Sequence, residues 1–161
     1  MAPELHPNLV ELAPLLGTWS GRGSGVYPTI PSFDYLEEVV FSHVGKPFLV
    51  YGQKTMSPTD GLPLHAEAGY LRVPAPGRIE WVLAHPSGIT EIEVGSYALI
   101  GGAVELQMSA PTIGLTPTAK EVTVLSRHYR LVGDELSYTL DMAAVGQPAQ
   151  NHLSATLYRT G

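Results

Sequence analysis

Hydrophobic and polar side chains alternate along most of the chain after residue 30. In the first of these stretches Phe33, Tyr35 and Phe41 fall on one parity, whereas Asp34 and Glu38 fall on the other. Successive side chains of a β-strand point to opposite faces, so this alternation is typical of a strand with one buried and one solvent-facing side. The pattern therefore predicts a strand here, and similar stretches recur to the end of the chain.

Ten strands are predicted in all, separated by short turn sequences that contain Gly, Pro or Asp-Gly. The predicted strands cover a glycine-rich stretch at 17–27 and residues 33–44, 48–51, 64–73, 78–84, 89–99, 104–109, 120–131, 135–145 and 149–159. The segment 111–118, which contains two prolines and a glycine, is predicted to be the longest loop.

These predicted strands are not separated by helices, which excludes a parallel sheet built with crossover helices. The sequence predicts an all-β fold, an antiparallel up-and-down barrel of about ten strands forming one domain over residues 1–161. Side chains just fill a barrel of about eight strands, so a barrel of about ten should enclose a cavity.

The N-terminal segment is expected to close one end of this barrel. Leucines at helical spacing predict a short helix over residues 8–16, with Asn8 as its N-cap and Gly17 as its stop. The strand that follows has Trp19 on the same parity as Gly21, Gly23 and Gly25. Glycines leave room for a close neighbour on that face, and the indole of Trp19 should fill the closed end.

Composition and charge exclude several classes of function. Nine basic residues against fifteen acidic ones give a formal charge of −6, which disfavours nucleic acid and anionic membranes as partners. The chain has no cysteine, so disulfides and thiolate ligands are excluded and a reducing cytoplasm is favoured. The N-terminus lacks the features of a signal peptide, and no apolar run approaches the roughly 20 residues of a membrane span. We therefore expect a cytoplasmic protein.

Most of the six histidines give no sign of chemistry in the sequence. No two have the spacing of a zinc site, and no serine lies in a strained glycine elbow of the kind that serine hydrolases use. His43 and His65 are interpreted as solvated strand residues, and His85 as an exposed residue at the start of a turn.

His152 differs from the others in its surroundings. It lies near the start of the last predicted strand, beside a strand with one apolar and flexible face. A neutral imidazole next to such a wall could bind a metal carried by an apolar cofactor, most commonly haem iron, although an edge histidine with a satisfied hydrogen bond is the alternative. Strict alternation places His152 opposite Leu153 and Leu157, so it points inward with them only if a bulge interrupts the strand.

The chain resembles the nitrobindin family in an ordered set of motifs that spans almost its whole length. Gly-Thr-Trp-Ser-Gly-Arg-Gly at 17–23 matches the family's GxWxGxG motif. Further matches lie at 27–30, 35–38, 43–48, 64–67, 84–89, 117–121, 147–148 and 152–153. The resemblance is to the single-domain actinobacterial members.

This resemblance implies a barrel similar to fatty-acid-binding proteins that holds one haem b near its mouth. The family's axial iron ligand falls on His152 and its haem-contacting threonine on Thr29, while Lys120 is a weaker candidate to pair with a haem propionate. The implied activity is isomerisation of peroxynitrite to nitrate on ferric haem, with reversible binding of nitric oxide and His152 as the catalytic residue. The sequence shows no distal histidine–arginine pair of the kind that peroxide cleavage uses, and it does not identify the residues of the distal wall.

Two alternative functions remain open at this stage. One is a carrier of a fatty acid or another apolar ligand, in which Arg127 or Arg159 acts with Tyr129 or Tyr158 to hold a carboxylate. The other is a haem or nitric oxide sensor without turnover. The sequence does not determine the oligomeric state, and a homodimer is one of the assemblies it allows.

Overall fold

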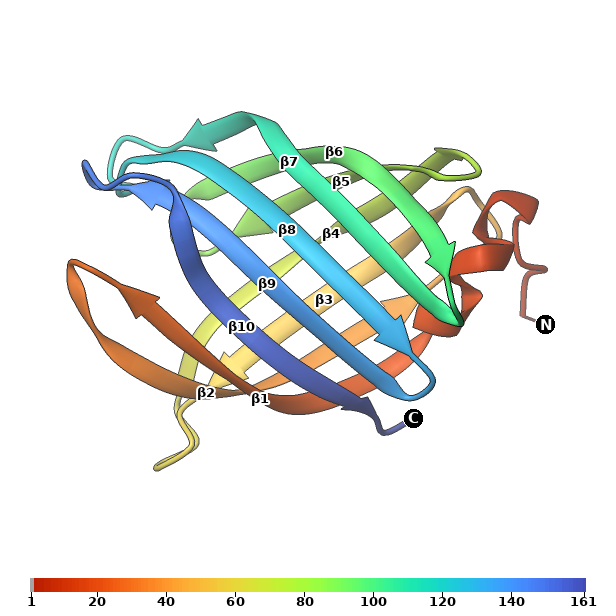
Figure 1. Ribbon diagram of the computed structural model, residues 1–161, viewed down its shortest axis with the longest axis horizontal. Helices are drawn as coiled ribbons and strands as arrows, with labels where there is room; N and C mark the ends of the chain where they lie inside the picture. The colour runs from red at the N-terminus through yellow and green to blue at the C-terminus, as the bar shows by residue number, and fades with distance from the viewer. Residues whose placement is uncertain (1) are drawn as a thin grey trace.

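A computed structural model, which describes residues 2–161, is a closed barrel of ten antiparallel strands that follow one another around the barrel in chain order (Figure 1). The predicted all-β up-and-down barrel is therefore confirmed. The strands are β1 (Gly17–Tyr27), β2 (Ile30–Ser42), β3 (Phe48–Met56), β4 (Pro63–Ala75), β5 (Arg78–His85), β6 (Ile89–Ile100), β7 (Ala103–Leu115), β8 (Val122–Val132), β9 (Glu135–Ala144) and β10 (Gln150–Arg159).

The glycine-rich strand β1 closes the barrel by pairing with β2 on one side and β10 on the other. Aromatic rings of β2 cover its glycines: a Cβ added to Gly23 would lie 2.2 Å from the ring of Tyr35, and one added to Gly25 would lie 2.2 Å from the ring of Phe33. The predicted bare face of this strand is thus filled by neighbouring side chains.

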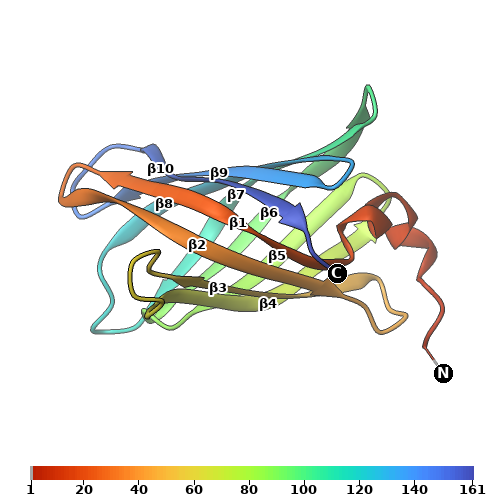
Figure 2. The ribbon, with the colours of Figure 1, turned by 90° about the horizontal axis from the view of Figure 1, so that it is seen from below.

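A short helix covers the end of the barrel at which both termini lie (Figure 2). It is the 3₁₀ helix η1 (Pro7–Leu15), and it buries Leu9, Leu12 and Leu15 against the barrel. Trp19 is fully buried beneath it and its Nε1 donates to the carbonyl of Leu15 at 2.8 Å, as expected for the plug of a closed end.

The sequence predicts Asn8 as the N-cap of this helix, but in the structure the N-cap is His6. Nδ1 of His6 accepts a hydrogen bond from the backbone N–H of Asn8 at 3.1 Å. The side chain of Asn8 instead donates to the carbonyl of Val73 at 3.0 Å, tying the helix to β4. A long-range contact therefore decides which of two suitable residues caps the helix.

The prediction of a long loop at 111–118 is wrong for residues 111–115, because β7 continues to Leu115. Beyond Ser109 the strand pairs with β6 alone, after a register shift between Ile92 and Val94 of that strand. Proline is tolerated where only one side of a strand is hydrogen-bonded, which explains why Pro111 does not end β7. No helix in residues 2–161 is long and apolar enough to cross a membrane.

Candidate functional site

A cavity of about 670 Å³ opens at the barrel end opposite η1, where the turns β1–β2, β3–β4, β5–β6, β7–β8 and β9–β10 lie. Its volume falls within the range of about 300–1,000 Å³ typical of small-molecule and cofactor sites. The apolar part of its wall is Ile30, Phe33, Leu64, Ile89, Val122, Leu125, Leu140, Met142 and Leu153. The cavity expected from the number of strands is therefore present, and it is largely apolar.

A bulge in β10 turns His152 into this cavity. The pairing of β10 with β9 shifts between Asn151 and Leu153, so His152 is the extra residue on its strand. Both His152 and Leu153 consequently line the cavity, although they are adjacent in sequence. The sequence had made an inward His152 conditional on such a bulge, and the structure supplies it.

The tautomer of His152 is set by a backbone carbonyl of β1. Nδ1 lies 3.1 Å from the carbonyl oxygen of Val26, which can only accept, so Nδ1 carries the proton. The rings of Tyr27 and Phe33 meet the imidazole edge-on, at centroid distances of 5.4 Å and 6.5 Å. In the described chain Nε2 has no protein partner, so its lone pair is available to a metal.

Burial lowers the pKa of His152, the hydrogen bond to Val26 opposes that shift and the nearby His65 adds to it. The pKa of His152 therefore lies below the ordinary value for histidine, which favours the neutral imidazole. Neutral imidazole is the form that ligates metal ions.

The other two candidates from the sequence lie at the mouth. Lys120 is exposed and lines the cavity at its rim, in the segment between β7 and β8. Thr29 is exposed in the turn between β1 and β2, next to the cavity-lining Ile30, and is not itself part of the wall. Their roles toward haem remain predictions.

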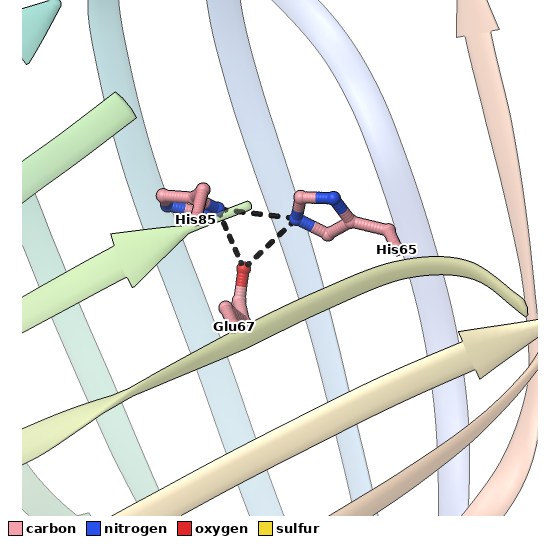
Figure 3. A group of neighbouring side chains, drawn as sticks. All are labelled: His65, Glu67 and His85. Carbon is pink, nitrogen blue, oxygen red and sulfur yellow. Dashed lines mark hydrogen bonds and ion pairs between the residues drawn. The ribbon is translucent and has the colours of Figure 1, made fainter. Parts of the chain in front are cut away.

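One wall of the cavity is polar, and it includes two histidines, His65 and His85, for which the sequence indicated no role at a site. His65 and Glu67 come from β4 and His85 from the end of β5, and their side chains point toward one another (Figure 3). Nε2 of His65 lies 3.1 Å from Nδ1 of His85. The side chain of His85 is only 10% exposed, so it is not the exposed turn residue that the sequence predicted.

Arg127 of β8 joins this polar wall from the barrel interior. Its guanidinium donates to both carboxylate oxygens of Glu67, at 2.8 Å and 3.2 Å, and also to Glu91. Burial by itself raises the pKa of Glu67 and Glu91, but the charge of Arg127 outweighs it and both pKa values fall below the ordinary value. Two ionised carboxylates thus surround one guanidinium inside the barrel.

A third buried carboxyl group, Glu37, has no cation within bonding distance in residues 2–161. It accepts from Tyr138 at 2.6 Å and from Gln53 at 2.8 Å. Burial raises the pKa of Glu37 to about 7, against the opposing effect of these two hydrogen bonds. The interior therefore combines ionised and partly protonated acids, a pattern frequent in functional sites.

The buried carboxyl group of Glu93 should make the free energy of unfolding depend on pH. Burial, assisted by the charge of Glu91, raises its pKa from 4.5 to about 8. Between these values the folded chain holds a proton that the unfolded chain has lost, so the free energy of unfolding should fall as pH rises from about 4.5 to about 8. Because Gln cannot ionise, Glu93→Gln should remove this contribution and gain stability relative to the wild type across that range.

Urea unfolding of both proteins at intervals between these pH values tests the expectation. The difference in unfolding free energy should grow with pH and level off above about 8. A constant difference over the whole range would show that Glu93 is ionised in the folded protein at neutral pH.

The interior acids of β6 were not predicted from the sequence, because on this strand the charged residues are buried and the aliphatic residues between them are exposed. On β6, Glu91 and Glu93 are fully buried, whereas Ile92 is 39% and Val94 45% exposed. The parity of residues along β6 indicates that the two acids are buried, because they lie on the same face as the buried Tyr97. Counting parity from that aromatic residue would have placed both acids inside.

The arginine–tyrosine pairs that a carboxylate carrier would need are not available for that role. Arg127 is buried and lies 3.3 Å from Tyr129, but its guanidinium is already bonded to Glu67 and Glu91. Arg159 lies over the ring of Trp19 at the opposite end, and Tyr158 is 56% exposed on the outside. Neither pair presents a free cation to the cavity, so the carrier alternative loses its proposed anchor.

Comparisons with known proteins agree with this architecture. A family model described as a THAP4-like, heme-binding beta-barrel domain matches residues 8–159. A protein of Mycolicibacterium paratuberculosis named Peroxynitrite isomerase 1 is 70% identical over 159 residues, and 99% of each chain is covered. A protein of the same name from Mycobacterium tuberculosis is 63% identical over 162 residues, again with 99% of each chain covered.

The crystal structure of Rv2717c from M. tuberculosis superimposes with a TM-score of 0.96 at 62% sequence identity, covering 98% of this chain and 100% of that one. The whole-length match of sequence and fold confirms the resemblance to the nitrobindins. This chain belongs to the family of THAP4-like haem-binding β-barrels.

Proposed function

We propose that this protein binds one haem b through His152 and isomerises peroxynitrite to nitrate, with reversible binding of nitric oxide. The observation that carries the proposal is His152 itself, turned into an apolar cavity by a bulge, with Nδ1 bonded to Val26 and Nε2 free. The name Peroxynitrite isomerase borne by relatives at 63–70% identity supports the assigned reaction.

The residues around the cavity fit a porphyrin. The apolar wall suits the faces of the macrocycle, whose burial is favourable by roughly 25 cal/mol per Å² of apolar surface. The hydrogen bond from Nδ1 to Val26 holds the imidazole plane and leaves a ligand lone pair on the opposite nitrogen. We further propose that Lys120 pairs with a propionate at the rim and that Thr29 contacts the cofactor at the β1–β2 turn.

When bound, ferric haem supplies an iron centre with an open coordination position for peroxynitrite. The chain's own part would be to hold and shield that centre: His152 would ligate and orient it, and the apolar residues of the cavity wall would limit the access of water. Peroxynitrite and nitrate contain the same atoms and carry the same charge, so no residue has to supply or remove an electron. This explains why a site without an external reductant suffices.

Stopped-flow absorbance tests the proposal. Haem-loaded protein should accelerate the decay of peroxynitrite in proportion to its concentration, whereas the haem-free chain should not. A sensor of haem or nitric oxide would bind haem and leave the decay rate unchanged, and that outcome would overturn the catalytic assignment.

The composition of the chain also supports a setting for this activity. The absence of cysteine supports the cytoplasm, and the net charge of −6 supports small molecules, not nucleic acid or anionic membrane, as partners. We also propose that residues 1–161 act as one domain and that two copies can associate as a homodimer, which analytical ultracentrifugation would detect.

A further inference from the structure

We propose that His65, Glu67 and His85 form a second metal site, distinct from His152, which takes a divalent transition-metal ion such as Zn²⁺. The three side chains line the same cavity as His152 but come from β4 and β5, and they converge on one point (Figure 3). One ligand atom from each lies within 4.8 Å of the other two.

The spacing of these atoms matches that of ligands around a single ion. Nε2 of His65 and Nδ1 of His85 are 3.1 Å apart, and they lie 3.8 Å and 3.4 Å from Oε2 of Glu67. Tetrahedral ligands at the metal–ligand distances usual for zinc, about 2.0–2.1 Å, are about 3.3–3.4 Å from one another. The three observed distances bracket that value, so small side-chain rotations complete the geometry.

The hydrogen bonds around the cluster leave the required lone pair on His85. Nε2 of His85 lies 2.8 Å from Oε1 of the ionised Glu91, to which it donates. The proton is therefore on Nε2, and Nδ1 faces His65 and Glu67 as an acceptor. A carboxylate behind a histidine is the usual outer partner of metal-binding histidines, where it fixes the tautomer and ring orientation.

The charge of the cluster also favours a cation. Glu67 and Glu91 both pair with Arg127, and its single guanidinium can offset only one of the two carboxylates. The remaining negative charge lies in a largely buried wall, where an unbalanced charge is costly. A divalent ion at Oε2 of Glu67 would neutralise it, while Oε1 keeps its bonds to Tyr51 and Arg127.

Two histidines and one carboxylate leave at least one coordination position for water or a cavity ligand. This ligand set is found in catalytic zinc sites and, with more open positions, in non-haem iron sites. The site shares no ligand with His152, although both face the same cavity.

Titration of the haem-free full-length chain with Co²⁺ tests the proposal through the visible d–d absorption of the bound ion. We expect one ion per chain, an absorption intensity typical of four ligands, and displacement by Zn²⁺. His65→Ala and His85→Asn should each weaken Co²⁺ binding at least about tenfold. His152→Ala and the outer-surface variant His128→Ala should bind as the wild type does.

Far-UV circular dichroism of each variant establishes that the barrel is intact. Binding that survives both His65→Ala and His85→Asn, or that is lost in His152→Ala, would overturn the assignment. Absence of saturable Co²⁺ binding in the folded wild type would do the same. Because haem is omitted throughout, none of these results depends on whether the protein isomerises peroxynitrite.

Discussion

Replacing His152 with alanine is expected to abolish the Soret band that haemin gives when it binds to this protein with an imidazole ligand. The substitution removes the coordinate bond at Nε2 but leaves the apolar wall unchanged. The hydrogen bond of Nδ1 to Val26 is lost with it, so the cavity no longer contains the one imidazole held in a ligating tautomer by the backbone. Absorbance spectra from about 350 to 700 nm during haemin titration would record the loss.

His65→Ala is the matched control, because it removes another imidazole from the wall of the same cavity. Its Nε2 is engaged with His85, so the wild-type haem spectrum should survive the substitution. If His152→Ala kept the wild-type Soret band and His65→Ala lost it, the axial ligand would have to be reassigned to the polar wall.

Replacing Arg127 with methionine should cause the largest loss of stability of any single substitution proposed for this protein. The change keeps most of the side-chain volume but leaves Glu67 and Glu91 ionised in the barrel interior without their cation. Removing one partner of a buried ion pair costs about 3–5 kcal/mol of unfolding free energy. Urea unfolding at pH 7 measures the loss.

Arg72→Met makes the same chemical change at the surface, where Arg72 pairs with Glu80 and its side chain is 57% exposed. That pair should contribute no more than about 1 kcal/mol. The deficit of Arg127→Met should also shrink in acid, since protonation of the two carboxylates removes the uncompensated charges. Equal losses in the two variants would mean that Arg127 does not neutralise the interior acids.

The barrel could be predicted from the sequence because its strands alternate cleanly and are joined by short turns. Alternation on β2 and the glycine–tryptophan parity of β1 depend only on neighbouring residues, and both were placed correctly. The end of β7 was not, because Pro111 is tolerated there by a register shift against β6 and by the absence of pairing with β8. That condition is a property of the assembled sheet.

The candidate site, like the fold, could be predicted from the sequence only in part. His152 could be singled out by its place beside an apolar strand, but its direction depended on a bulge that the sequence does not specify. The polar wall was missed because Glu67, Glu91 and Arg127 compensate one another across three strands. Each falls on the buried parity of its own strand, but the opposite charge that allows it to be buried comes from another strand and is in place only once the barrel has closed.

The central claim is that Nε2 of His152 holds iron inside this cavity. Resonance Raman spectroscopy of the ferrous haem-loaded protein tests it most directly, since the iron–imidazole stretching mode reports the axial bond itself. We predict a band that shifts to lower frequency when the histidines carry ¹⁵N and that is absent from His152→Ala protein. A band whose frequency does not change with the isotope, or that persists after His152 is replaced, would contradict the claim.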